Sequence, residues 1–377
     1  MLYYLFVALR LLSTLLPLPL LTLLYALRIK RRPRPSWSSP QCALLDFNRR
    51  VAGLVDIAGM RWEVRDPSAE PSPRELRETS FERVDGLSRE ELVGVLRDDN
   101  VGPTNAVGCF VWERRRNDSV EQLAEGFVGI YAHGGLYLYF SAHDSSATSA
   151  IPRYLMKVAV EYRLLPAPFP AALQDVAAVF VRLIQLVVPA DRIILIGDST
   201  GGNIMLALAR WIRDEGLLRQ PAGVLLLSAT DPLNSQLPAY SFRTSFKSFK
   251  PHPHPKDYLT DHPPAYRHNV QSFLGAHRPH SFLRHPYISP SATPVPDESF
   301  KSFPPVFVQY GDAERLEEEI DQLVAAVRQV EASVEVEKTV DGVHDLLILL
   351  FWDSGVKKKI YKRIEEWLRE LKSSGQG

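Results

Sequence analysis

Short apolar runs alternate with segments of helical spacing along most of the chain, and this alternation restricts the fold more than any other feature. Runs such as IILI at residues 193–196 and VLLLS at 224–228 carry almost no polar residue. Strands that are apolar on both sides belong to a parallel sheet covered by helices on both faces. The sequence therefore predicts an α/β fold with a mostly parallel central sheet. The predicted strands are residues 127–132, 156–162, 193–196, 224–228, 306–310 and 333–340, and the predicted helices are residues 43–59, 171–187, 203–216, 315–330 and 357–371.

The composition permits a large core and excludes a nucleic-acid partner. Hydrophobic residues make up 45% of the 377 residues, which is enough for one large domain with insertions or for two domains. The 44 Lys and Arg residues balance the 44 Asp and Glu residues, so the basic excess of a nucleic-acid-binding protein is missing. Cys42 and Cys109 can form one bridge at most, which makes neither a disulfide framework nor a zinc site.

The N-terminal segment differs from the rest of the chain. Residues 11–27, LLSTLLPLPLLTLLYAL, carry no charge, and a basic run, RIKRRPRP, follows at once. A cleaved signal peptide has its positive charge before the apolar run, so this order favours a retained membrane anchor over residues 1–28 and a linker over 29–42. The positive-inside rule then places the rest of the chain in the cytosol. Pro17 and Pro19 leave an interfacial or hairpin insertion open, and a buried helix is the remaining alternative.

A G-x-S-x-G motif, GDSTG at residues 197–201, lies between a predicted strand and a predicted helix. In this context the motif forms a sharp turn that presents a nucleophilic serine. The glycines lack a Cβ and let strand and helix approach closely, and a helix N-terminus favours developing negative charge. Ser199 is therefore the candidate nucleophile. The alternative is a glycine-rich turn whose serine caps the helix.

A nucleophilic serine also needs donors that bind the oxyanion of the acyl-transfer intermediate. The segment AHGGLY at residues 132–137 directly follows a predicted strand. Its adjacent glycines can turn backbone N–H groups into a cavity, where the amide of Thr200 joins them. These amides are the candidate oxyanion donors, and an ordinary Gly-Gly turn is the alternative.

The base and its orienting acid come later in the chain, in the order Ser, acid, His that this motif requires. His344, in GVHD, directly follows the strand predicted at 333–340. Catalytic groups collect at the carboxyl edge of an open α/β sheet, so His344 is the candidate base. The segment YGDAERLEEE follows the strand predicted at 306–310 and offers Asp312 and Glu314 as acids. Spacing alone does not choose between them, because either can instead cap the next helix.

Four segments in this order resemble the hormone-sensitive lipase-like esterases of the α/β-hydrolase fold. HGGLY resembles the HGGG oxyanion motif, and EYRLLPAPFPAALQD resembles the segment YRLAPE-x-x-FPA-x-x-x-D. GDSTGGN resembles the GDSAGGN elbow, and GVHD lies where that family has its catalytic histidine. The resemblance covers the chain from about residue 128 to the C-terminus.

The resemblance implies a role for each candidate. Ser199 takes the place of the nucleophile and His344 that of the base. Glu314 aligns with the first residue of the family's D-x-L-x-D-E segment, so it is favoured as the acid, with Asp312 as the alternative. In the family, the glycines of the HGGG motif supply amides, and the positions that match them best here are Gly135 and Leu136.

Two positions depart from the family's motifs. Leu136 stands where the family has the last glycine, which leaves the amide but restricts the backbone. Thr200 stands where the family has alanine, so the third oxyanion amide is retained beside a larger, hydroxylated side chain. Neither departure removes a catalytic group.

The resemblance also predicts the domain organisation and the membrane. The hydrolase domain is expected over residues 43–375, with lid regions at about 43–105 and 231–305. Membrane-anchored relatives, similar to arylacetamide and steryl deacetylases, often face the lumen of the endoplasmic reticulum. This side of the membrane is opposite to the cytosolic side that the basic run predicts.

The predicted function is that of a membrane-associated serine hydrolase that cleaves carboxylic esters of hydrophobic molecules. The expected partners are a small hydrophobic ester as substrate and membrane lipid, with no metal or organic cofactor. An amidase, or arylacetamide deacetylase, with the same catalytic residues is one alternative. A non-catalytic protein of the same fold that binds a small ligand is the other.

Overall fold

The protein is described here by a computed structural model. It describes residues 2–58, 63–112, 126–155, 157–186, 188–229, 257–259, 270–291, 299–330 and 332–374. Most of the lid region predicted at 231–305 lies outside these residues.

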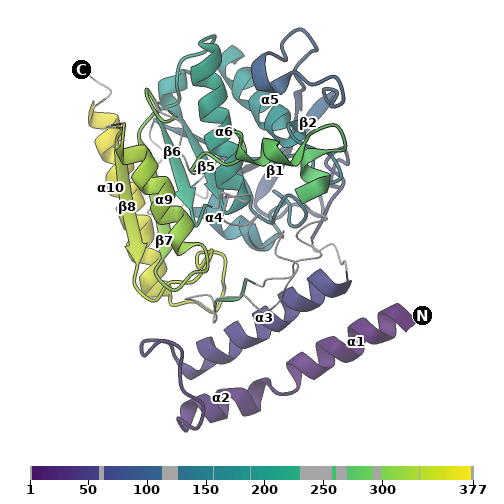
Figure 1. Ribbon diagram of the computed structural model, residues 1–377, viewed down its shortest axis with the longest axis vertical. Coiled ribbons are helices and arrows are strands. Elements are labelled where there is room, and N and C mark those ends of the chain that lie inside the picture. The colour runs from purple at the N-terminus through teal and green to yellow at the C-terminus, as the bar shows by residue number, and fades with distance from the viewer. Residues whose placement is uncertain are drawn as a thin grey trace.

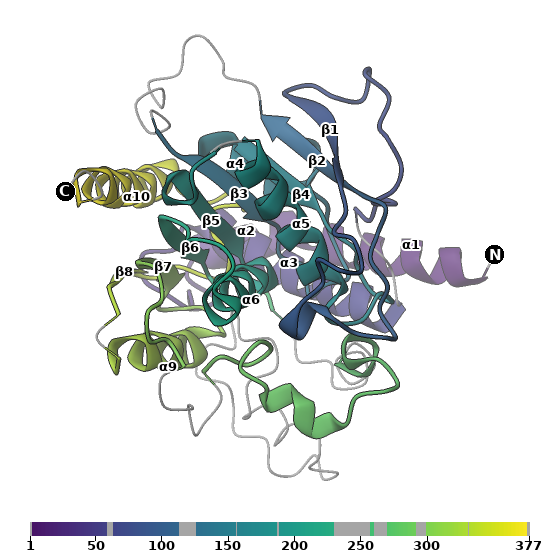
Figure 2. The same cartoon turned by 90° about the horizontal axis from the view of Figure 1, so that it is seen from above.

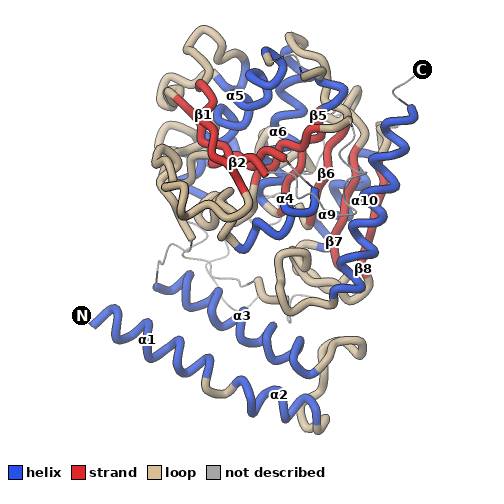
Figure 3. The backbone as a smooth tube through the Cα atoms, turned by 180° about the vertical axis from the view of Figure 1, so that it is seen from behind, coloured by secondary structure: helices blue, strands red, loops and turns tan. Residues whose placement is uncertain are grey.

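An eight-stranded sheet in the order β1-β2-β4-β3-β5-β6-β7-β8 forms the centre of the molecule (Figure 3). β1 pairs antiparallel with β2, and β2 pairs antiparallel with β4. Every other neighbouring pair, from β4–β3 to β7–β8, is parallel. The six predicted strands are β3 to β8, which confirms the mostly parallel sheet. The strands are β1 Thr79–Asp85, β2 Ala106–Trp112, β3 Val128–Ala132, β4 Lys157–Glu161, β5 Ile193–Asp198, β6 Gly223–Leu227, β7 Val306–Gly311 and β8 Val334–Thr339.

Helices cover both faces of the sheet. Figure 2 shows α5, α6 and α9 on one face and α4 and α10 on the other. The helices are α1 Leu2–Leu15, α2 Leu18–Ala26, α3 Ser39–Ala58, α4 Ala150–Leu155, α5 Ala171–Gln185, α6 Thr200–Glu215, α9 Glu317–Arg328 and α10 Ser354–Ser374. Short 3-10 helices are η1 Gly94–Leu96, η3 Ala147–Ser149, η4 Ala190–Arg192 and η6 His280–Arg284.

Strand β5 shows why apolar runs indicate this architecture. Ile193 and Leu195 pack into the core beneath α5 and α6, whereas Ile194 and Ile196 pack into the core beneath α10. Successive side chains of a strand point to opposite faces, so residues 193–196, which are buried on both sides, are all apolar. Because β3 to β8 are mutually parallel, their carboxyl ends lie at one edge of the sheet.

The lid predicted at residues 43–105 requires a correction. Residues 79–85 form β1, which pairs with β2 from Thr79 opposite Trp112 to Asp85 opposite Ala106. This strand belongs to the central sheet. It escaped prediction because it is an edge strand with polar, partly exposed side chains, so it lacks the apolar run of a buried strand.

The linker predicted at residues 29–42 is also shorter than expected. Helix α3 begins at Ser39, and Trp37 is only 2% exposed. The Trp37 indole N–H donates to the carbonyl oxygen of Asp341, at 2.8 Å. Its Pro and Ser residues made this segment resemble a flexible linker. The buried Trp37 ring instead packs it against the hydrolase domain.

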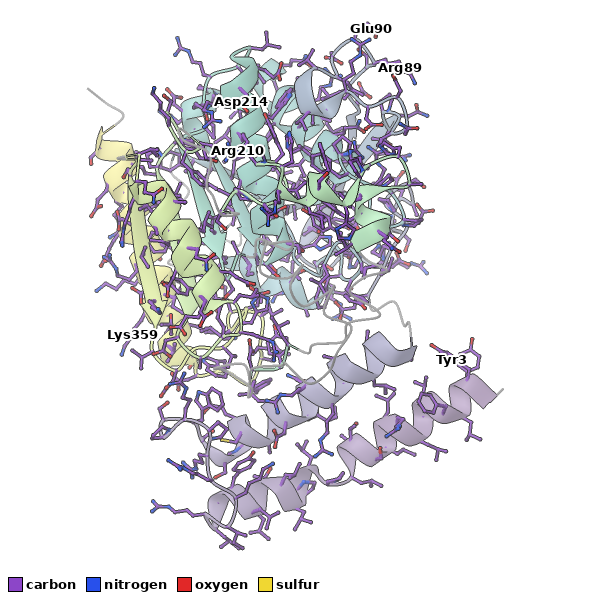
Figure 4. All side chains as sticks on the ribbon, viewed as in Figure 1. Tyr3, Arg89, Glu90, Arg210, Asp214 and Lys359 are labelled. Atoms are coloured by element: carbon purple, nitrogen blue, oxygen red, sulfur yellow. The ribbon has the colours of Figure 1, made fainter. Side chains whose placement is uncertain are left out.

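The predicted anchor forms two helices instead of one. α1 and α2 are separated by a turn at Leu16 and Pro17 and lie along α3, outside the body of the molecule (Figure 1). The hydroxyl of Tyr3 donates to the carbonyl oxygen of Ala58 at the far end of α3, at 2.9 Å (Figure 4). The segment Tyr3–Ala26 is long and apolar enough to cross a membrane, by length and composition alone, and 11% of its most apolar window is buried.

Candidate active site

Ser199 occupies a strained turn between β5 and α6. Its backbone dihedrals are φ 47° and ψ −123°, a region that side-chain-bearing residues rarely adopt. The turn depends on its glycines, because a Cβ on Gly197 would lie 2.4 Å from the backbone of Gly201. The strand, sharp turn and helix that the G-x-S-x-G motif requires are therefore all present, and the Ser199 side chain lies at the carboxyl edge of the sheet.

His344 meets Ser199 at this edge. It follows β8, and its Nε2 lies 3.1 Å from the Ser199 Oγ, although the two residues are 145 positions apart. This distance allows the imidazole to accept the serine proton. Ser199 is 5% exposed and His344 is 3% exposed, so their contact is shielded from bulk water.

Glu314 lies on the other side of the imidazole. Its Oε1 is 3.9 Å from His344 Nδ1, and within the described part of the chain neither atom has a hydrogen-bond partner. The second oxygen, Oε2, accepts hydrogen bonds from the Ser228 hydroxyl at 2.8 Å and the Gly311 amide at 3.0 Å. These two donors hold the carboxylate in place, with its free oxygen toward the histidine.

Asp312, the alternative acid, faces elsewhere. Its Oδ1 accepts a hydrogen bond from the Asp341 amide at 2.6 Å, and its carbonyl oxygen accepts one from Arg34 at 2.8 Å. The side chain therefore braces the loop between β8 and His344, and the geometry favours Glu314 as the acid.

Asp345 is a neighbour of the imidazole that the sequence analysis missed. Its Oδ2 lies 3.1 Å from His344 Nε2, the nitrogen that also faces Ser199. Burial alone lowers the pKa of His344, but the charges of Asp345 and Glu314 raise it. The resulting pKa of His344 is well above the usual value for histidine. The only sequence signal for this residue was its place next to His344 in the GVHD segment. The backbone at Asp345 has a φ of 45°, in the left-handed region.

The loop that carries the predicted oxyanion donors packs against the turn at Ser199. The Gly134 amide donates to Asp198 Oδ1 at 3.0 Å, and the Tyr131 hydroxyl donates to the same oxygen. A Cβ on Gly134 would lie 2.9 Å from the Cβ of Ser199, so the loop approaches the nucleophile as closely as glycine permits. Burial, together with the charge of Asp345, raises the pKa of Asp198.

The three predicted donors lie together in this region. Gly135 and Leu136 follow Gly134 directly, and Thr200 opens α6 next to Ser199. In the structure the Leu136 amide donates to the Thr200 side-chain oxygen, Oγ1, at 3.1 Å. In the described part of the chain, no group of three or more His, Cys, Asp or Glu residues is arranged to hold a metal ion.

A family model described as the α/β-hydrolase fold matches residues 129–348, more than half of the chain. The chain belongs to this family. The matched segment contains the loop of the predicted oxyanion donors at residues 133–137, the turn at Ser199, Glu314 and His344, so the whole candidate site lies within it.

Individual relatives agree with this assignment. An acetyl-hydrolase of Streptomyces hygroscopicus is 27% identical over 294 residues, which are 77% of this chain and 86% of the relative. Esterase LipI of Mycobacterium tuberculosis is 35% identical over 124 residues, 30% of this chain and 38% of the relative. Among solved structures, an esterase from the bacterial hormone-sensitive lipase family superimposes with a TM-score of 0.55 at 20% identity. That match covers 94% of this chain and 97% of the other, and it shows a shared fold.

Proposed function

We propose that Ser199, His344 and Glu314 form the catalytic triad with which this protein hydrolyses carboxylic esters. The observation that carries the proposal is the 3.1 Å contact between Ser199 Oγ and His344 Nε2 at a strained turn. The family match and the relatives named as acetyl-hydrolase and esterase support the same reaction class.

The proposed mechanism uses side chains and backbone amides of this chain only. His344 Nε2 accepts the proton of Ser199 while the serine oxygen attacks the ester carbonyl carbon. The amides of Gly135, Leu136 and Thr200 bind the resulting oxyanion. The protonated His344 then gives its proton to the leaving alcohol, which leaves an acyl-enzyme on Ser199. A water molecule, deprotonated by His344, attacks the acyl-enzyme, and the proton returns to Ser199 as the acid departs.

Paired substrates test the reaction class. We expect purified protein to cleave an aryl acetate faster than the matched acetanilide, and a fluorophosphonate probe to label Ser199. Equal or faster cleavage of the anilide would instead assign the protein to the amidases. Absence of both labelling and turnover would make it a ligand-binding protein of the same fold.

We further propose that α1 and α2 attach the enzyme to a membrane, so that hydrophobic esters reach the site from lipid. Large apolar side chains of both helices and of the turn between them are exposed, among them Leu9 of α1, Leu16 of the turn and Leu23 of α2. Arg28 and Arg31 follow as exposed positive charges. The endoplasmic reticulum is the membrane that the resemblance to anchored deacetylases implies.

The attachment helices lie beside the catalytic edge, which supports delivery from lipid. Arg49 of α3 donates through Nε to the carbonyl oxygen of Asp257 at 2.8 Å. The next residue, Tyr258, has its ring centroid 6.1 Å from that of His344. Since α1 and α2 pack along α3 (Figure 1), a bilayer that contacts them lies close to the site.

Flotation with phosphatidylcholine vesicles tests the attachment. Burying one leucine side chain contributes about 1.5–3 kcal/mol, so replacing Leu9, Leu16 and Leu23 by Glu is expected to weaken vesicle binding at least about 100-fold. The matched control replaces three exposed leucines elsewhere, Leu186, Leu217 and Leu350, by Glu and should float like the wild type. Equal loss in both variants, or none in the first, contradicts attachment through α1 and α2.

A further inference from the structure

Three side chains hold the proposed oxyanion loop, residues 133–137, against the end of β5 and the start of α6. Asp198 accepts the Gly134 amide at 3.0 Å, and Asn203 accepts the Tyr137 hydroxyl at 2.9 Å. Between them, the Thr200 Oγ1 accepts the Leu136 amide at 3.1 Å. The first and last contacts hold the two ends of the loop, whereas the middle one engages a proposed oxyanion donor itself.

Leu136 needs such a partner because its backbone is strained. Its φ is 57°, in the left-handed region, which costs a residue with a side chain roughly 1–2 kcal/mol. The Leu136 side chain is 36% exposed, so packing alone holds it weakly. One hydrogen bond contributes about 0.5–1.5 kcal/mol, which is comparable to the strain.

The two residues of this contact are the two positions at which the chain departs from the HGGG and GDSAGGN motifs. They are 64 positions apart in sequence. Leu136 adds backbone strain, and Thr200 adds the hydroxyl that accepts a hydrogen bond from the strained Leu136 amide. Thr200 is fully buried, so its hydroxyl is not a surface group held by solvent.

We propose that the Thr200 hydroxyl is a positioning group that holds the Leu136 N–H beside the turn at Ser199 while no substrate is bound. This proposal rests on the triad proposed above. A neutral hydroxyl is a weaker acceptor than an oxyanion, because hydrogen bonds to a charged group are about twice as strong. The N–H therefore exchanges the Thr200 oxygen for the substrate oxygen as negative charge develops, by a rotation of the Gly135–Leu136 peptide group.

Two substitutions at residue 200 separate the hydroxyl from the shape of the side chain. Thr200→Val keeps the branched shape and removes the hydroxyl, and Thr200→Ser keeps the hydroxyl. Loss of a whole oxyanion donor costs about 10²–10³ in rate, and a donor that is present but misdirected is expected to cost about tenfold. We therefore expect Thr200→Val to lower kcat about tenfold with little change in KM, and Thr200→Ser, which keeps the acceptor oxygen, to lower kcat clearly less than Thr200→Val. An unchanged or higher kcat in Thr200→Val, or equal losses in both variants, overturns the proposal.

The strain argument predicts how the two departures combine. Glycine adopts the left-handed region at little cost, so the hydroxyl should matter less once Leu136→Gly is present. We expect Thr200→Val to cost no more than about threefold in kcat in that background, a coupling that a double-mutant cycle measures. A full tenfold loss in both backgrounds contradicts a link between the hydroxyl and the strain of Leu136.

Hydrogen exchange of the Leu136 amide gives a readout that does not depend on catalysis. In Thr200→Val, a peptide covering residues 132–140 should exchange faster by mass spectrometry, because the amide has lost its acceptor. Unchanged exchange overturns the positioning role even if the enzyme is active. Faster exchange in a protein that neither turns over esters nor is labelled at Ser199 rejects the triad while retaining the contact.

Discussion

Ser199→Ala is expected to abolish ester hydrolysis, lowering kcat by at least about 10⁴-fold, because removing the nucleophile of a serine hydrolase leaves only oxyanion and binding contributions. The measurement is product formation from a lipid extract and from an aryl acetate, with wild type and variant compared at equal concentration. The fluorophosphonate label should disappear together with the activity.

The structure indicates that this variant will fold. Alanine differs from serine at this site by one oxygen, whose recorded contact is the 3.1 Å hydrogen bond to His344. The strained φ of 47° is the same for both residues. Ser373→Ala, at the exposed end of α10, is the matched control and should retain full activity. Identical product profiles from Ser199→Ala and wild type, with the melting temperature unchanged, would reject the esterase proposal.

Glu314→Gln is expected to lower kcat by about 10³–10⁴-fold, because a neutral amide no longer stabilises the imidazolium or holds its tautomer. The Glu314 charge also raises the pKa of His344. The base works only when it is neutral, so activity rises with pH through this pKa. Removing the Glu314 charge lowers the pKa of His344, and the acidic limb of the residual pH–rate profile should therefore move to lower pH.

Asp312→Asn is the matched control for the acid. Asp312 accepts the Asp341 amide at 2.6 Å, and an asparagine side-chain oxygen can accept the same bond. We expect kcat within about threefold of wild type and a loss of stability of no more than about 1 kcal/mol, the net contribution of one hydrogen bond.

Asp345 does not substitute for Glu314, because it faces Nε2 and leaves Nδ1 without a carboxylate. If Asp312→Asn is the inactive variant and Glu314→Gln the active one, the acid is Asp312.

Most of the fold followed from the period of apolar residues. Residues 193–196 of β5 and the whole of β6 carry no polar side chain, because both faces of the sheet are buried. The edge strand β1 carried no such pattern, because its side chains are mostly polar and only partly buried. The burial of Trp37 likewise escaped prediction, because a single ring in a segment rich in Pro and Ser has no period.

The candidate site divides in a similar way. Local motifs sufficed to single out Ser199 and His344, and chain order placed an acid between them. The choice between Glu314 and Asp312, two positions apart, depended on which side chain turns inward, and the contacts of Gly311 and Ser228 with Glu314 decide that direction.

The sequence by itself determined the sheet, its covering helices and the candidate nucleophile and base, because each of these leaves a periodic or local pattern. Only the tertiary structure brought Thr200 to Leu136, Asp345 to His344 and the apolar helices to the catalytic edge. Each of these contacts depends on the direction of the backbone at a few positions. The spacing of residues along the chain carries no information about that direction, so the sequence alone could not predict the contacts.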